Sequence, residues 1–94
     1  MDILYADFVW DIQKELLNVK KHGIDFTTAA MAFSDPARKI YRDSKHSGAE
    51  ARFFCVGRVD GRVVTVRYVE RQGKIRIFGA GCWRKGARHY EKED

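Results

Sequence analysis

The residues with the clearest chemical potential are basic side chains interleaved with aromatic ones in the second half of the sequence. Guanidinium groups bind phosphate through paired hydrogen bonds, and aromatic rings stack on unpaired bases. The basic residues are Arg52, Arg67, Arg71, Arg76, Arg84, Lys85 and Arg88, and the aromatic ones are Phe53, Phe54, Tyr68, Phe78, Trp83 and Tyr90. This pattern is typical of a single-stranded RNA site, although the rings could instead belong to a hydrophobic core. Strand alternation places either Phe53 or Phe54 in the core, so Trp83 and Tyr90 are the better candidates for exposed rings.

A polar segment at residues 43–51 adds side chains that can move protons, namely Asp43, His46 and Glu50. Histidine titrates near neutral pH and loops often carry function, so the segment could supply an acid–base pair or contact RNA. It could equally be a solvated loop. The spacing is not specific for a metal, and we expect neither a bound metal ion nor a cofactor.

A smaller basic group, Lys20, Lys21 and His22, precedes Gly23 at the end of a predicted helix. Cations at this position complement the negative end of the helix dipole. They could also contact phosphate, and the sequence favours neither interpretation over the other.

The composition is that of a globular protein, with 94 residues, 45% hydrophobic and 33% charged. We expect one domain spanning residues 1–94. The sequence lacks an apolar run long enough for a membrane helix and a basic N-terminal signal region. Its two cysteines, Cys55 and Cys82, are too few for a disulfide framework, so we expect a cytoplasmic protein with Cys55 in the core.

The net charge of +5 is concentrated in the second half of the chain. Residues 1–47 carry seven basic and seven acidic side chains, whereas residues 51–90 carry ten basic and two acidic ones. Charge alone indicates a polyanionic partner, which could be nucleic acid, an anionic membrane surface or an acidic protein. A generally basic surface without such a partner is the alternative.

The first half of the sequence predicts a strand followed by two helices and a short strand. Residues 3–10 are rich in strand formers, Asp11 is a candidate N-cap, and Gly23 is a candidate helix terminator. The helix between these two residues has apolar side chains at helical spacing, which are Ile12, Leu16, Leu17 and Val19.

A second, short helix is expected at residues 28–33, capped by Asp25 or Thr27 and ended by Pro36. A short strand is expected at residues 38–42.

The second half predicts three antiparallel strands at residues 52–59, 62–70 and 74–80. Asp60-Gly61 and Gln72-Gly73 are the turns that join them. A loop leading into a short helix is expected in the remaining residues.

The fold class that follows is α+β, a small antiparallel sheet with two N-terminal helices packed on it and a short C-terminal helix. The core face of the sheet is marked by Val64, Val66, Tyr68, Ile75 and Ile77. Arg67 and Arg76 belong to the opposite face, which is either solvated or a binding surface.

Six sequence fragments, in order, resemble the BrnT-type toxins. They are Trp10-Asp11; Asn18-x-x-Lys21-His22-Gly23-Ile24-x-Phe26; Ala29-Ala30 with Phe33-x-Asp35-Pro36; His46-x-x-x-Glu50-x-Arg52 with Gly57; Val66-x-Tyr68-x-Glu70-Arg71; and Ile75-Arg76-Ile77. The resemblance implies a RelE/ParE-like superfold and a ribonuclease toxin of a type II toxin–antitoxin module, which arrests translation by cleaving RNA. It also implies a DNA-binding antitoxin of the BrnA type, with promoter DNA bound only through the toxin–antitoxin complex and no membrane partner.

The sequence departs from the family pattern after Ile77. Many members continue with Ser-Ala-Arg, and here Gly81 stands where that arginine would be. The tail Gly79-Ala80-Gly81-x-Trp83-Arg84-Lys85-Gly86 looks like a variant within the same family. Arg84 or Lys85 could replace the missing arginine.

RNA cleavage by attack of the 2′-hydroxyl needs a base for its proton, cations for the phosphate and an acid for the leaving 5′-oxygen. The candidate catalytic residues are His46, Glu50, Arg52, Tyr68, Arg76 and Arg84. We assign the base to Glu50 or His46, the acid to His46 or Tyr68, and phosphate stabilisation to the arginines. The RNA-binding candidates are Lys21, His22, Arg67, Arg71, Trp83, Lys85 and Arg88. Glu70 and Arg71 could instead form a structural ion pair.

The alternative function is a non-catalytic RelE-fold protein that binds RNA, the ribosome or an antitoxin without cutting. The glycine at position 81 favours this alternative. A DNA-binding regulator is disfavoured, because no helix-turn-helix with a basic recognition helix is visible in the sequence.

Overall fold

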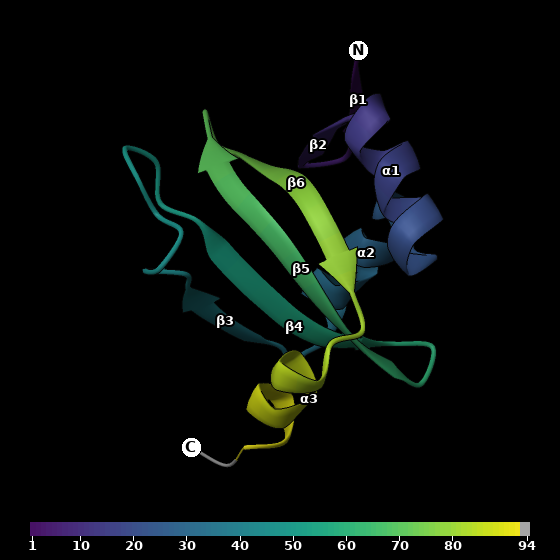
Figure 1. Cartoon of the computed structure of the whole chain (residues 1–94), viewed down its shortest axis with the longest axis vertical. Coiled ribbons are helices and arrows are strands. Elements are labelled where there is room, and N and C mark those ends of the chain that lie inside the picture. The colour runs from purple at the N-terminus through teal and green to yellow at the C-terminus, as the bar shows by residue number, and fades with distance from the viewer. Residues whose placement is uncertain (93–94) are drawn as a thin grey trace.

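The computed structural model describes residues 1–92, which fold into a mixed sheet with helices on both of its faces (Figure 1). In chain order the elements are β1 (Asp2–Tyr5), β2 (Phe8–Asp11), α1 (Ile12–His22), α2 (Phe26–Ala30), the 3-10 helix η1 (Met31–Ser34), β3 (Lys39–Arg42), β4 (Phe53–Val59), β5 (Arg62–Arg71), β6 (Lys74–Gly81) and α3 (Arg84–Glu91). The α+β class is therefore confirmed. Within residues 1–92, no helix is long and apolar enough to cross a membrane.

The sheet is larger than the small antiparallel one predicted from the sequence. It has six strands in the order β1-β2-β6-β5-β4-β3. Strands β2 and β6 pair in parallel, with Phe8 opposite Ile75, and every other neighbouring pair is antiparallel. The expected three-stranded meander is its centre, and the N-terminal segment and β3 extend it on either side.

The N-terminal prediction of one strand over residues 3–10 is wrong, because the segment is a hairpin of β1 and β2. Tyr5 and Phe8 are opposite one another, and Ala6 takes a φ of 53° in the turn between them. A non-glycine residue at positive φ is uncommon, and Ala6-Asp7 is not one of the dipeptides that signal a hairpin turn. The sequence therefore indicates strand-forming residues in this segment, but it has no residue pattern that marks the turn between the two strands.

The predicted helix caps are confirmed. The Asp11 carboxylate accepts a hydrogen bond from Lys14 N at 3.1 Å, and Gly23 ends α1 with a φ of 71°. Asp25, rather than Thr27, caps α2 by accepting from Thr28 N at 2.7 Å. Each carboxylate satisfies a backbone N–H that has no partner within the helix.

The two predicted turns between the central strands are also confirmed. Asp60 and Gly61 have φ values of 48° and 80°, and Gln72 and Gly73 have values of 52° and 76°. Two consecutive residues at positive φ form the tight turn whose twist matches that of an antiparallel hairpin.

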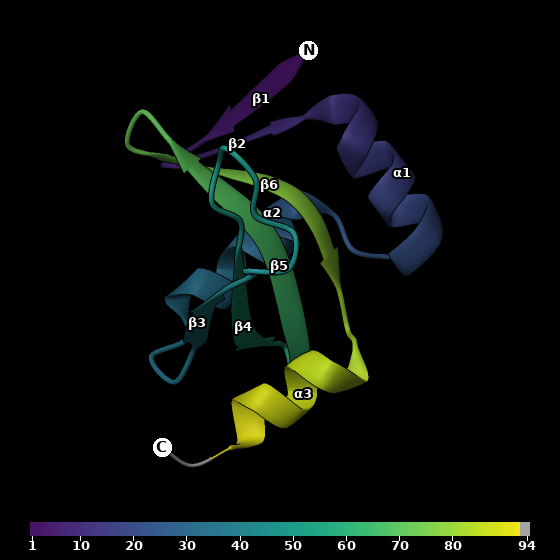
Figure 2. The ribbon, with the colours of Figure 1, turned by 60° about the vertical axis from the view of Figure 1, so that its left-hand side comes forward.

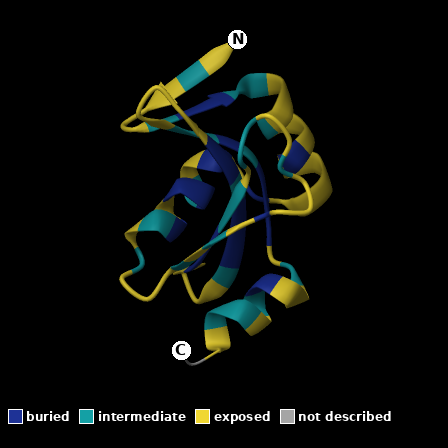
Figure 3. Ribbon diagram, turned by 90° about the vertical axis from the view of Figure 1, so that its left-hand side faces the viewer, coloured by how far each residue is buried: buried dark blue, intermediate teal, exposed yellow. Residues whose placement is uncertain are grey.

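The hydrophobic core lies on the sheet face that is covered by α2 and η1 (Figure 3). Its largest fully buried side chains are Trp10, Tyr68, Phe26, Ile24, Ile77, Val64, Val66 and Cys55. The predicted core face of β5 and β6 is confirmed, with Ile75 only partly buried. Cys55 is buried as expected, and burial raises its pKa to about 12.

The helix α1 has the predicted bounds, but its apolar face is not buried. Leu16, Leu17 and Val19 are exposed, and the buried residue of this helix is Asn18. The Asn18 amide donates to Ala80 O at 2.9 Å and accepts from Ala80 N at 3.1 Å, so it adds a pair of hydrogen bonds to the β6 backbone. A polar residue therefore fixes α1 beside β6 (Figure 2).

The C-terminal helix α3 follows β6 almost directly, so the loop predicted before it is very short. It covers the end of β4 and β5 on the face opposite α2, where Val56 and Thr65 are buried. Tyr90 on this helix donates to the Asp35 carboxylate at 2.6 Å, and the same Asp35 oxygen accepts from Arg58 N at 2.7 Å. Asp35 thus joins α3 to the segment after η1 and to β4.

Candidate functional site

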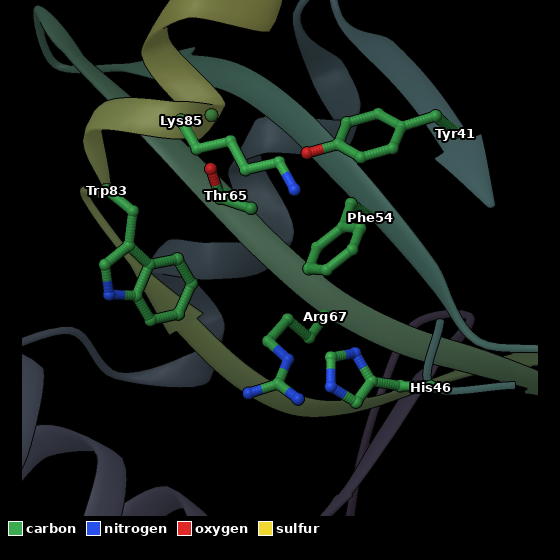
Figure 4. Close-up of a pocket in the computed structure, with 8 residues that line it drawn as sticks. Tyr41, His46, Phe54, Thr65, Arg67, Trp83 and Lys85 are labelled. Atoms are coloured by element: carbon green, nitrogen blue, oxygen red, sulfur yellow. The ribbon is translucent and has the colours of Figure 1, made fainter. Parts of the chain in front are cut away.

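A cavity of about 390 Å³ opens on the sheet face opposite the core, between α3 and the 43–52 loop (Figure 4). We call it the His46 cavity. It is lined by Tyr41, His46, Phe54, Thr65, Arg67, Trp83, Lys85 and Gly86. Its volume lies within the range of about 300–1,000 Å³ that is usual for ligand sites.

The floor of the cavity is set by strand register. Tyr41 on β3 is opposite Phe54 on β4, Phe54 is opposite Arg67 on β5, and Arg67 is opposite Gly79 on β6. Phe54 and Arg67 alternate with the core residues of β4 and β5, and Tyr41 lies opposite Phe54, so these side chains share the open face. Two aromatic rings and a guanidinium group thereby form one row.

His46 enters from the loop and is held by Asp43. The ring Nδ1 lies 2.8 Å from Asp43 Oδ2, and Asp43 is only 9% exposed. An ionised carboxylate can only accept, so Nδ1 carries the hydrogen and Nε2 is the free basic nitrogen when the ring is neutral. The arrangement gives His46 a defined tautomer at the edge of the cavity.

Asp43 is itself fixed by its surroundings. Its backbone N–H donates to Arg52 O at 2.8 Å, and its carbonyl accepts from the Ser47 hydroxyl at 2.7 Å. Burial raises the pKa of the Asp43 carboxyl, but hydrogen bonds from the side chain and backbone of His46, together with the nearby charge of Arg67, outweigh this effect. The net pKa is below the ordinary value, so Asp43 is ionised at neutral pH.

The positive charges of the open face gather around one aromatic ring. The guanidinium carbons of Arg52 and Arg67 each lie 5.1 Å from the ring centre of Phe78. Within residues 1–92, neither arginine has a carboxylate at ion-pair distance. Cations without neutralising partners beside a cavity create a positive potential that attracts anions.

Two residues of the C-terminal tail complete the wall opposite His46. The Lys85 ammonium comes from the first turn of α3 and points into the cavity, and Trp83 forms a side wall (Figure 4). Gly86 allows α3 to lie against the sheet, because a Cβ there would be 1.8 Å from Thr65 Oγ1. Of the two cations expected to replace the arginine missing at position 81, Lys85 lines the cavity and Arg84 does not.

Several predicted catalytic residues lie outside the His46 cavity. Tyr68 is buried in the core on the other face of the sheet, and burial raises its pKa to about 12. Glu50 binds Arg71 through two hydrogen bonds of 2.6 and 2.8 Å. Arg71 therefore forms a structural ion pair, but with Glu50 and not with Glu70, the partner considered from the sequence.

Arg76 is also held away from the cavity. Its guanidinium bonds both carboxylate oxygens of Asp2 on β1, at 2.6 and 3.3 Å. Arg84 and Arg88 are exposed on α3 without lining the cavity, whereas Lys21 and His22 line a second cavity that adjoins it. The structure thus brings together four of the sequence-predicted residues, which are His46, Arg67, Trp83 and Lys85.

The sequence predicts no site role for Tyr41 or Thr65 and leaves Phe54 open between the core and the RNA site. It indicates Asp43 only as one member of the polar segment 43–51. The Asp-x-x-His spacing was the available signal for Asp43. Tyr41 and Phe54 become recognisable only when the register of β3 and β4 is known. Within residues 1–92, no group of three or more His, Cys, Asp or Glu side chains is arranged to hold a metal ion.

The chain was compared with models of known protein families. The model of a family described as the ribonuclease toxin BrnT of type II toxin–antitoxin systems matches residues 10–86. No curated protein matches the chain. The matched segment contains the 43–52 loop, the central strands and the first residues of α3, which together build the His46 cavity.

Proposed function

The chain belongs to the BrnT family of ribonuclease toxins of type II toxin–antitoxin systems, and on this premise we propose that it cleaves RNA in the His46 cavity. Membership of the family implies an RNA substrate and an antitoxin protein as partner. The observation that carries the proposal is the position of three groups around one cavity: the imidazole of His46, the guanidinium of Arg67 and the ammonium of Lys85.

The proposed reaction is metal-independent attack of the ribose 2′-hydroxyl on the neighbouring phosphate. The Nε2 atom of His46 accepts the 2′-hydroxyl proton as the bond from the 2′-oxygen to phosphorus forms. The bond from phosphorus to the 5′-oxygen breaks, and Lys85 gives a proton to that oxygen. The products are a 2′,3′-cyclic phosphate and a 5′-hydroxyl end.

The geometry supports this division of roles. His46 and Lys85 enter the cavity from opposite sides, as an in-line displacement requires, and Arg67 rises from the sheet floor beside His46 (Figure 4). Arg67 stabilises the extra negative charge of the pentavalent phosphate. Asp43 acts as a positioning residue, because it keeps Nε2 of His46 free to take the proton.

The proposal narrows the set of catalytic residues predicted from the sequence. It retains His46 and replaces Tyr68 by Lys85 as the acid. Arg67 takes the phosphate-stabilising role that was predicted for Arg52, Arg76 and Arg84. Arg52 stays a candidate for phosphate contact through its position over Phe78.

A cleavage assay tests the proposal with a single-stranded RNA that contains all four bases. We expect activity in the presence of EDTA, the product ends named above, and no cleavage when the substrate is 2′-deoxy. His46→Ala and Arg67→Ala should each lower kcat by about 10²-fold or more. Arg62→Ala is the matched control for Arg67→Ala, because Arg62 is an exposed arginine on the same strand.

Three outcomes would contradict the catalytic proposal. Loss of activity in EDTA would remove the metal-independent mechanism, and cleavage of 2′-deoxy substrate would remove the 2′-hydroxyl attack. RNA binding by folded wild-type protein without any cleavage would favour the alternative, a non-catalytic protein that binds RNA, the ribosome or its antitoxin. The glycine at position 81 is the observation that keeps this alternative open.

We further propose that the partner is a DNA-binding antitoxin of the BrnA type that masks the positive face. Promoter DNA would be bound by the complex and not by this chain alone. The support is the collection of unneutralised cations near Phe78, which an acidic antitoxin segment would complement. Co-purification as one species on gel filtration, with DNA binding only by the pair, is the expected result; separate elution of the two proteins would contradict it.

Three broader assignments complete the proposal. Residues 1–94 act as one toxin domain in the cytoplasm, where the RNA substrate is found. The helices on one face of antiparallel β4, β5 and β6 support kinship with the RelE-like fold.

A further inference from the structure

A second cavity, of about 270 Å³, lies between α1 and the end of β6. We call it the Lys21 cavity. Its α1 wall carries Lys14, Lys21 and His22, and its other wall is formed by β5, β6 and Trp83. Arg67 and Trp83 line both this cavity and the His46 cavity. The two cavities are therefore neighbouring parts of one groove that runs across the open face from α1 to the 43–52 loop.

The charged side chains that line the groove are all basic. Among the described residues that line the two cavities, none is acidic. Lys14 and Lys21 have no ion-pair partner in the part of the chain that the structure describes. Elsewhere on the surface, Arg71 and Arg76 are paired with carboxylates. Cations that line a groove without carboxylates favour an extended polyanion.

Trp83 stands where the two cavities meet. Its indole and the imidazole ring of His22 pack edge to face, with a centroid distance of 5.2 Å and an interplanar angle of 78°. The Trp83 side chain is only partly buried. An aromatic ring between two clusters of phosphate-binding cations is the arrangement by which proteins hold successive nucleotides of a single strand.

We propose that the Lys21 cavity is a second nucleotide subsite for the same RNA strand that is cut in the His46 cavity. Lys14 and Lys21 bind a backbone phosphate next to the scissile one, and a base stacks on Trp83. This inference rests on the proposed function, because it places the neighbouring nucleotides of that substrate. It identifies the substrate as single-stranded RNA long enough to occupy both cavities, rather than a dinucleotide or a duplex.

Substrate length provides the test. A hexanucleotide reaches both cavities, whereas a dinucleotide occupies only the His46 cavity. We expect Lys21→Ala to raise KM for the hexanucleotide several-fold with little change in kcat, and to leave both constants for the dinucleotide unchanged. Lys20→Ala is the matched control, because Lys20 is the preceding lysine on the same helix and does not line the groove.

Salt dependence gives a second readout that a merely structural role of Lys21 would not change. For a non-cleavable 2′-O-methyl hexanucleotide, the slope of log affinity against log salt concentration should become shallower by about 0.7 in Lys21→Ala. Equal effects of Lys20→Ala and Lys21→Ala, or equal effects on the two substrate lengths, would overturn the subsite. So would a Lys21→Ala effect confined to antitoxin binding, since the groove would then belong to the protein partner.

The two proposals fail in different ways. If the wild-type protein binds the 2′-O-methyl hexanucleotide but cuts no RNA, the cleavage proposal fails while the Lys21 comparison still decides the subsite. If it cuts both substrate lengths with the same KM, cleavage stands and the second subsite is rejected.

Discussion

The indole ring of Trp83 occupies the space that a side chain on Gly81 would need. A Cβ at position 81 would lie 2.7 Å from both Cε2 and Cζ2 of Trp83, well inside van der Waals contact. Gly81, where the resemblance led us to expect an arginine, is therefore coupled to the ring that joins the two cavities. A side chain at position 81 and the observed position of Trp83 exclude one another.

The first prediction concerns this coupling. Gly81→Ala should displace Trp83 and weaken binding of the 2′-O-methyl hexanucleotide by up to about 1–3 kcal/mol, the usual value of one base stacked on an aromatic ring. Trp83→Ala should weaken binding by a similar amount. Because both changes remove the same contact, the double variant should bind no more weakly than Trp83→Ala alone, as measured by fluorescence anisotropy of labelled RNA. Additive losses would show that the two positions act independently.

The second prediction concerns Asp43 and His46. Asp43→Asn should lower kcat for RNA cleavage by about 10²-fold or more with little change in KM, because the neutral amide no longer enforces the tautomer with a free Nε2. In a His46→Ala background the same substitution should have no further effect on kcat. A melting curve for each variant checks that the 43–52 loop remains folded. A large additional loss in the double variant would mean that Asp43 acts on something other than His46.

The third prediction concerns the attachment of α1. Asn18→Ala removes a buried side chain that bonds Ala80 through both its amide nitrogen and its oxygen. We expect the free energy of unfolding to fall by about 1–3 kcal/mol, since the Ala80 backbone groups lose these partners in a buried site. Leu16→Ala, on the same helix, should change it by less than about 0.5 kcal/mol because Leu16 is 55% exposed. Urea unfolding measures both, and the reverse order would show that the apolar face of α1 is buried.

Local signals in the sequence predicted the centre of the fold. Asp60-Gly61 marks a tight turn because glycine accepts positive φ, and Asp11 and Gly23 mark helix ends because they satisfy free backbone groups. The parallel pairing of β2 with β6 joins residues far apart in the sequence, and no local pattern encodes it. Helical periodicity likewise located α1, but it did not predict that the side of the helix carrying Leu16 is exposed.

Part of the candidate site was predictable from the alternation of side chains between the two faces of a strand. Tyr68 shares its face with Val64 and Val66, so alternation along β5 already separates it from Arg67 on the open face. The ion pairs that hold Arg71 and Arg76 were beyond such reasoning. Their partners, Glu50 and Asp2, are brought to them by tertiary structure.

The last prediction concerns the bond between Tyr90 and Asp35, which fixes α3 and therefore the position of Lys85. The Tyr90 hydroxyl is the main cause that lowers the pKa of Asp35 below its ordinary 3.8, with the backbone N–H groups of Arg58 and Ala37 adding to it. A carboxylate with a lowered pKa stabilises the folded state at pH values above its unfolded pKa. That stabilisation is lost as the pH falls through the folded pKa.

The same bond raises the pKa of Tyr90 above its ordinary 10.0. The stability that the bond gives through the tyrosine is therefore fully present below that pH, and it is lost as the pH rises through the pKa of the folded state. Tyr90→Phe should therefore lower Tm at neutral pH, and the difference from wild type should shrink below about pH 4 and above about pH 10. Tyr5→Phe is the control, because no hydrogen bond holds that exposed hydroxyl within the described residues. Thermal melts between pH 2.5 and 11 measure the difference, and a constant gap between wild type and Tyr90→Phe across this range would show that Asp35 ionisation does not stabilise α3.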